Sequence, residues 1–203
     1  MDRATLDRIN SIHFEIGDRA NTALCVLTTL ILIAYSAIGI LMFLGPATNP
    51  IPFLIAYSLW IFVGIVILIR YKDKPSLVIG LYMLIMSVDR LYTTILMPEE
   101  FSTLELCVEA LLSVFMLVSG IRWLLGNAYS RFPAMISAAA FIVLSLQDLI
   151  SMIMDAGQMI SDQTLLPAVS FIMCIIIYSL MIVILMCNNI NKTRYLFGKK
   201  NEQ

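Results

Sequence analysis

The stretch Met86-Ser87-Val88-Asp89-Arg90-Leu91-Tyr92-Thr93-Thr94 places an acid and a base side by side inside an apolar run. The run covers residues 76–97 and is long enough to cross a lipid bilayer. A charge at membrane depth costs about 2.5 kcal/mol or more, so its side chain normally faces a partner or a water-filled cavity. We therefore expect Asp89 and Arg90 to form part of a site whose other members come from neighbouring helices.

The composition is that of an integral membrane protein. Of the 203 residues, 60% are hydrophobic and only 13% are charged, and the mean hydropathy is +0.91. Soluble domains carry about 25% charged residues. At about 20 apolar residues per crossing, a chain of this length forms a compact bundle and leaves no room for a sizeable soluble domain.

Six apolar runs predict six transmembrane helices, and the fold class is therefore all-α. The runs cover residues 21–45, 51–70, 76–97, 102–125, 133–155 and 165–187. Glycine and proline separate them, including Gly45-Pro46, Pro98, Gly126 and Gly157 with Pro167. We expect a transmembrane domain over residues 21–187, a cytoplasmic amphipathic segment over 1–20 and a basic cytoplasmic tail over 188–203.

The first 20 residues predict a short helix that lies on the membrane surface. Their apolar side chains, Leu6, Ile9, Ile12 and Ile16, recur at helical spacing and are surrounded by charged residues. A cleavable signal peptide would have an earlier apolar region followed by small residues, and this segment has neither.

Basic residues predict the orientation of the helices. They precede the first run and follow the second, fourth and sixth, at Arg3, Arg8, Arg19, Arg70, Lys72, Lys74, Arg122, Arg131, Lys192, Arg194, Lys199 and Lys200. The alternate loops, 46–50, 98–101 and 156–164, contain no lysine or arginine. Because cytoplasmic loops carry the excess of basic residues, both termini are predicted to be cytoplasmic and the protein to be a multi-pass plasma (inner) membrane protein.

The runs also repeat as three in-out-in hairpins. Pro46 and Pro98 mark outer turns, and the second and fourth runs end alike in Gly64-Ile65 and Gly120-Ile121. With both ends cytoplasmic, this pattern resembles the HdeD-like acid-resistance membrane proteins over most of residues 21–190. The resemblance implies a six-helix membrane protein with a role in acid stress. The sixth run departs from it, because Tyr178 and Ser179 stand where the Gly-Ile would fall.

Charged side chains on three runs fall at a similar depth in the outer half of the membrane. At about 1.5 Å per helical residue, Asp89 and Arg90 lie on the order of 13 Å below Pro98. The same count places Glu109 and Asp148 roughly 10 Å below the outer ends of their helices. The candidate ligand-binding residues are therefore Asp89, Arg90, Glu105, Glu109 and Asp148.

Helical spacing suggests the partners of Arg90. Asp89 and Arg90 are about 100° apart on their helix and cannot pair well with each other. Arg90 is therefore expected to reach Glu109 or Asp148 on another helix, or to extend toward the outer surface. Glu105 and Glu109 share one helical face at i, i+4.

The acids outnumber the base. One arginine neutralises one carboxylate, which leaves two or three acids uncompensated among Asp89, Glu105, Glu109 and Asp148. We expect that they are protonated, that a cation or cationic ligand lies among them, or that water reaches them from outside.

Other chemistry has little support in the sequence. The four cysteines lie in or at the ends of apolar runs and form no C-x-x-C, and the only histidine, His13, precedes the first run. No nucleophile–base pair, metal-ligand spacing or glycine-rich phosphate loop is present, so we expect no enzyme, metal or cofactor. No basic cluster with interleaved aromatics favours nucleic acid. Tyr35, Tyr57, Tyr82, Tyr92, Tyr178, Trp60 and Trp123 are expected to pack or to anchor the helices at the membrane interface.

Three hypotheses for function remain. The first is a non-enzymatic membrane protein whose outward-facing acidic cluster binds or senses protons or a small cationic solute. The second is a substrate-capture or transport subunit, and the third is a structural or assembly scaffold in which the pairing of Arg90 only holds the helices together. The sequence leaves open whether the chain binds a second copy of itself or another membrane protein.

Overall fold

The computed structural model describes residues 17–44, 50–97, 102–126, 130–155 and 162–187, and the regular structure in these ranges is entirely helical. The helices are α2 (Asp18–Phe43), α3 (Ile51–Val66), which continues into the π-helical turn η1 (Ile67–Tyr71), α4 (Pro75–Leu96), α5 (Thr103–Leu124), α6 (Arg131–Asp155) and α7 (Asp162–Cys187). Within the described ranges, six helices are long and apolar enough to cross a membrane, which confirms the all-helical fold class.

The helix ends follow the apolar runs to within three residues. Two details differ from the sequence prediction. The interfacial segment was expected to reach residue 20, but α2 already begins at Asp18, since the N–H of Asn21 bonds to the carbonyl of Gly17 at 3.0 Å. The sequence predicts a break that includes Pro167, but Pro167 is the sixth residue of α7, so the helix begins before it and lacks one backbone N–H donor at that position.

The expected segments at the two ends of the chain are largely outside the described residues. The proposed surface helix falls almost wholly within residues 1–16, and the basic tail covers residues 188–203. Both therefore stay predictions.

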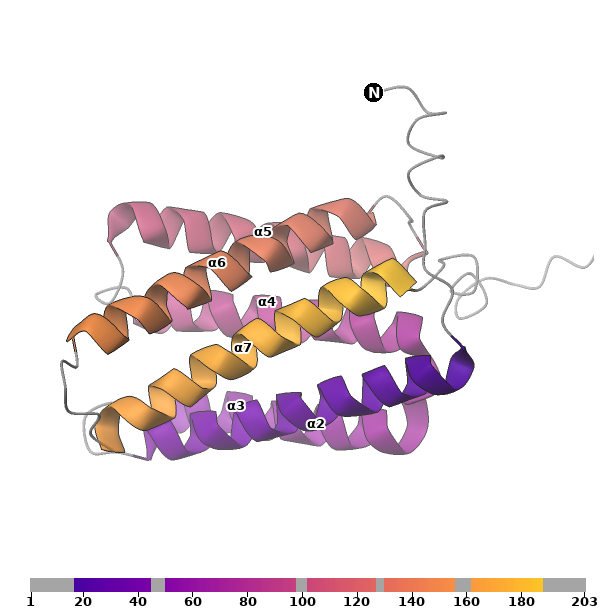
Figure 1. The fold of residues 1–203 in the computed structure, drawn as a ribbon, viewed down its shortest axis with the longest axis horizontal. Helices are drawn as coiled ribbons and strands as arrows, with labels where there is room; N and C mark the ends of the chain where they lie inside the picture. The colour runs from indigo at the N-terminus through magenta and orange to yellow at the C-terminus, as the bar shows by residue number, and fades with distance from the viewer. Residues whose placement is uncertain (1–16, 45–49, 98–101, 127–129, 156–161, 188–203) are drawn as a thin grey trace, which may run out of the picture.

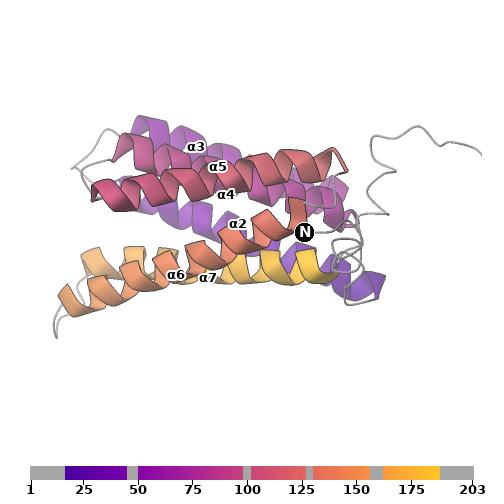
Figure 2. The same ribbon diagram turned by 90° about the horizontal axis from the view of Figure 1, so that it is seen from above.

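Helices that follow one another in the chain pack as pairs. The pairs α2–α3, α4–α5 and α6–α7 make the most extensive contacts, and α2 with α7 and α5 with α6 join the pairs to one another (Figures 1 and 2). Helix α4 also contacts α2 and α7. Its most apolar 18-residue window is 56% buried, against 22–39% for the other five helices. The helix that carries Asp89 and Arg90 is thus the most enclosed one.

The two ends of the bundle differ in charge. Helix α2 begins and α7 ends at the same end of the bundle, on the right of Figure 1, which we call the terminal end. The described basic residues outside the helix interiors lie there: Arg19, Arg70, Lys72, Lys74, Arg122 and Arg131. The opposite end, where α4 ends and α5 begins, is called the hairpin end.

Close packing between α4 and α5 depends on two glycines. A Cβ atom at Gly120 would lie 2.9 Å from the Cβ of Met83, and one at Gly80 would overlap the Cδ2 of Leu124. Small residues at such positions let two helix backbones approach closely, which in a membrane replaces the hydrophobic driving force of soluble proteins. The glycine that closes the fourth apolar run therefore positions α5, and with it Glu109, against α4.

Candidate functional site

Asp89 and Arg90 point to different neighbours of α4. Asp89 is 3% exposed, and its two carboxylate oxygens accept hydrogen bonds from two other helices. The Tyr35 hydroxyl on α2 donates to Oδ2 at 2.7 Å, and the Trp60 Nε1 on α3 donates to Oδ1 at 3.3 Å. Asp89 is thus bound to the α2–α3 pair.

Arg90 faces the other side of the bundle. Its Nη1 lies 3.4 Å from Oε1 of Glu109 on α5, and its Nη2 donates to the Ser145 hydroxyl on α6 at 2.7 Å. The guanidinium carbon lies 5.4 Å from the ring centre of Phe141, also on α6, within the range of a cation–π contact. The prediction that Arg90 pairs across helices is confirmed, with Glu109 as its acid.

Two adjacent residues therefore connect α4 to four other helices. Because consecutive side chains on a helix are about 100° apart, Asp89 can serve α2 and α3 while Arg90 serves α5 and α6. One turn further on, the Thr93 and Thr94 hydroxyls donate to the backbone carbonyls of Asp89 and Arg90 at 3.0 and 2.7 Å. These hydrogen bonds run across the bundle without interruption. We call the residues that make them the polar layer: Tyr35, Trp60, Asp89, Arg90, Thr93, Thr94, Glu109 and Ser145.

Around Arg90, several buried polar atoms have no hydrogen-bond partner among the described residues. They are Oε2 of Glu109, the Ser113 hydroxyl, the Tyr178 hydroxyl and Nε of Arg90. Glu109 is 3% exposed and Ser113 and Tyr178 are fully buried. An unsatisfied buried polar group costs about 1–3 kcal/mol, and more when it is charged. Such a group calls for a specific explanation, and a bound ion or water is one.

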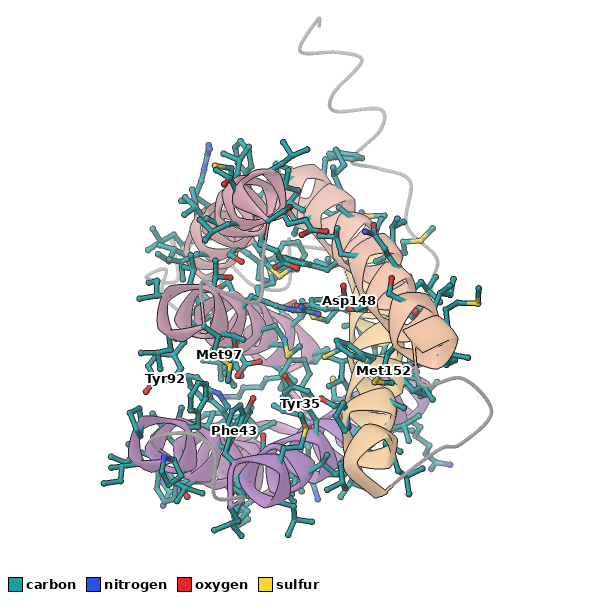
Figure 3. All side chains as sticks on the ribbon, turned by 90° about the vertical axis from the view of Figure 1, so that its left-hand side faces the viewer. Tyr35, Phe43, Tyr92, Met97, Asp148 and Met152 are labelled. Carbon is teal, nitrogen blue, oxygen red and sulfur yellow. The ribbon has the colours of Figure 1, made fainter. Side chains whose placement is uncertain are left out.

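Asp148 is the third acid near Arg90. It is half-buried on α6. In the view from the hairpin end, Asp148 points toward the middle of the bundle, as Tyr35 and Met152 do (Figure 3). Its carboxylate is close enough to Arg90 and Glu109 for their charges to interact. The structure gives Asp148 no ion pair with Arg90, so the geometry selects Glu109 from the two predicted partners.

Glu105 has a different role from Glu109. Its Oε2 accepts a hydrogen bond from the Ser102 backbone N–H at 2.9 Å, and the Ser102 hydroxyl accepts one from the Glu105 N–H at 3.3 Å. These reciprocal bonds form a capping box at the start of α5. The shared helical face suggested that the two acids act together, but the cap holds the Glu105 carboxylate at the helix end, about one turn nearer the hairpin end.

Sequence reasoning missed three members of the polar layer. The sequence predicts that Tyr35 and Trp60 mainly pack or anchor the helices, whereas in the structure both donate to Asp89. Ser145 was not among the candidate residues, although it accepts the shortest hydrogen bond of Arg90. The available clue was depth, because Tyr35, Trp60 and Ser145 all lie well inside their helices. Small hydroxyls and aromatics at that depth are common in membrane helices, so depth alone did not select them.

Comparisons of the chain with protein-family models, curated proteins and solved structures found no match.

Proposed function

We propose that the chain is a non-enzymatic, multi-pass membrane protein that binds a small cation, either a proton or a cationic solute, through Glu109 and Asp148. The carboxylates lie in the half of the bundle nearer the hairpin end. The observation that carries the proposal is the Oε2 atom of Glu109, which is buried and has no partner among the described residues. A proton or an N–H group of a ligand would satisfy it.

The local charge balance supports a cation. In and beside the polar layer, the positive charge of Arg90 is outnumbered by three acids, Asp89, Glu109 and Asp148. Glu109 shares Arg90 with Ser145, and the like charge of Asp148 acts on it. Carboxylates close together in a medium of low dielectric bind protons or cations to offset their repulsion. The resemblance to acid-resistance membrane proteins agrees with a role linked to protons.

Orientation in the membrane is part of the proposal. The terminal end carries the basic residues, and the described part of the hairpin end carries none. By the positive-inside rule, the terminal end and both termini face the cytoplasm and the hairpin end faces outward across the plasma membrane. Glu109 and Asp148 would then be reached from outside the cell.

Asp89 and Arg90 fit a structural role better than direct ligand binding. Both oxygens of Asp89 already accept hydrogen bonds, and Arg90 binds two helices at once. We therefore assign them to holding the bundle together, as the scaffold hypothesis proposes, and assign cation binding to Glu109 and Asp148.

Thermal unfolding of the purified protein in detergent tests the proposal. The melting temperature is measured in sodium chloride and in ammonium or methylammonium chloride at equal ionic strength, for wild type, Glu109→Gln and Asp148→Asn. Asp73→Asn is the matched control, because Asp73 is an exposed acid at the terminal end. We expect the ammonium salts to stabilise wild type and the control and to lose this effect in both site variants.

A wild type that responds equally to all three salts would contradict binding of a cationic solute, and a melting temperature that also stays constant from pH 4 to pH 8 would leave only the scaffold hypothesis. Uptake of methylammonium into proteoliposomes then separates a transport subunit from a protein that only binds or senses the cation. Uptake that depends on Glu109 would assign transport.

A further inference from the structure

Building on the proposed function, we propose that the ligand is a hydrophobic amine: an ammonium group that still carries N–H, attached to an aromatic or apolar body. The ammonium group would bind Glu109 and Asp148, and the body would lie toward the hairpin end of the bundle.

The first observation is a connected set of aromatic rings between α2, α3 and α4, which we call the aromatic array. It consists of Tyr35, Phe43, Phe53, Tyr57 and Tyr92. Phe43 and Phe53 stack with ring centres 3.9 Å apart, and Phe53 meets Tyr92 edge-on at 5.6 Å. Tyr57 lies 6.1 Å from Phe43 and 6.0 Å from Tyr35. Through Tyr35, the array ends at the carboxylate of Asp89.

The array is open to its surroundings only near the hairpin end. Tyr35, Phe53 and Tyr57 are buried, whereas Phe43, the last residue of α2, and Tyr92, in the last turns of α4, are half-buried. In the view from the hairpin end, Phe43 and Tyr35 face the middle of the bundle across from Asp148 and Met152, and Met97 lies beside them (Figure 3). Met97 and Met152 are half-buried too.

These side chains suit an apolar cation better than a hydrated ion. Aromatic faces attract cations, and flexible thioethers adapt to apolar bodies of different shape. A bare metal ion or a hydrated ion would instead need several oxygen ligands. The described residues contain no group of three His, Cys, Asp or Glu side chains placed to hold a metal.

The polar end of the site calls for a ligand that donates hydrogen bonds. When Glu109 is ionised, its Oε2 can accept hydrogen bonds but cannot donate them. The buried Ser113 hydroxyl, on the next turn of α5, also has no hydrogen-bond partner among the described residues. A protonated amine has N–H donors for such acceptors, and a quaternary ammonium has none. The acceptors therefore select a primary or secondary amine.

The test compares four probes against the purified full-length protein in detergent, with binding measured from ligand-dependent melting temperatures. They are 2-phenylethylammonium, its N-trimethyl analogue, the neutral 2-phenylethanol and methylammonium. We expect 2-phenylethylammonium to bind at least ten-fold more tightly than any of the other three. Glu109→Gln should abolish its binding, and Asp148→Asn provides a second variant if Glu109→Gln does not fold.

The aromatic contribution is tested by Phe43→Leu. Loss of the contact between Phe43 and the ring of the ligand corresponds to a roughly 2- to 10-fold weaker affinity, so we expect a decrease in that range for 2-phenylethylammonium and none for methylammonium, which has no ring. Phe115→Leu is the matched control, because Phe115 is 51% exposed on α5 and belongs to neither the array nor the polar layer.

The outcomes separate the two proposals. If methylammonium binds as tightly as 2-phenylethylammonium and Glu109→Gln abolishes both, cation binding stands and the hydrophobic-amine inference is overturned. Equal binding of the N-trimethyl analogue overturns the requirement for N–H. If 2-phenylethanol binds equally well, if binding survives Glu109→Gln and Asp148→Asn, or if no probe binds, the hydrophobic-amine inference is overturned together with binding of a cationic solute at this site, and of the proposed function only proton binding is left.

Discussion

At the scale of single residues, Arg90 divides its hydrogen bonds between Glu109 and Ser145, and its ion pair with Glu109 is longer than ideal. The Nη1–Oε1 distance to Glu109 is 3.4 Å, longer than the 2.7–2.9 Å of a strong charge-assisted bond, whereas the bond to Ser145 is 2.7 Å. Replacing a buried pair by apolar residues is often neutral, but removing one partner leaves an uncompensated charge. The consequence of mutation thus depends on which partner remains.

We expect Arg90→Ala to lower the free energy of unfolding by about 3–5 kcal/mol, since it leaves Glu109 buried without a counter-charge. Combining it with Glu109→Gln should recover much of the loss, whereas combining it with Asp148→Asn should recover much less. Denaturation in detergent of the single and double variants measures the coupling. Simple additivity of Arg90→Ala and Glu109→Gln would show that the contact contributes nothing to stability.

At the scale of helices, two devices position α5 relative to α4. One is the capping box at Ser102 and Glu105, which determines where α5 begins. The other is the close contact at Gly120, which determines how near α5 lies to α4. Glu109 lies between them and depends on both for its approach to Arg90.

For the cap, we expect Ser102→Ala to destabilise the protein by about 0.5–2 kcal/mol, because α5 loses a side-chain acceptor for its free backbone N–H groups. Glu105→Gln should leave the stability nearly unchanged, since glutamine also completes a capping box. Both variants should keep the response to ammonium salts. Loss of that response in Glu105→Gln would return Glu105 to the binding site, as the sequence first suggested.

For the close contact, we expect Gly120→Ala to cost about 1–3 kcal/mol, because its Cβ would meet the Cβ of Met83, which can move only with the backbone of α4. Gly80→Ala is the paired variant. Its added atom meets the flexible end of Leu124, so a smaller loss is expected. Thermal unfolding of the two variants decides the point, and an equal or larger effect at Gly80 would contradict it.

At the scale of the whole molecule, the bundle is polarised along its axis. Described basic residues other than Arg90 gather at the terminal end, and the buried acids lie toward the hairpin end. This polarity underlies the proposed orientation, and the proposed cation site lies in the half of the bundle opposite the basic loops.

Cysteine labelling in intact cells checks the orientation. In a background without the native cysteines, Thr48→Cys, Glu100→Cys and Gln163→Cys should react with a membrane-impermeant maleimide, because the outer segments 46–50, 98–101 and 156–164 contain no basic residue. Asp73→Cys should react only after the cells are permeabilised. Protection of the first three sites together with labelling at position 73 would reverse the topology.

Much of the architecture was readable from the order of residues. The length and apolarity of six runs specified six helices to within three residues at each end, because a bilayer leaves a chain no other way to satisfy its backbone over such lengths. The depth of Asp89, Arg90, Glu109 and Asp148 followed from the constant rise of a helix. The 100° between Asp89 and Arg90 was enough to predict that Arg90 pairs with another helix.

Which side chains meet was decided only by the packing of the helices. Depth is a property of one helix, but contact depends on the rotation of each helix about its axis and on which helices are neighbours. That is why Arg90 selects Glu109 over Asp148, why Asp89 belongs with Tyr35 and Trp60, and why Ser145 enters the layer at all. The capping bonds between Ser102 and Glu105 give Glu105 a different role from Glu109. A helix N-terminus has free backbone N–H groups, and the acid three residues after the cap bonds to them.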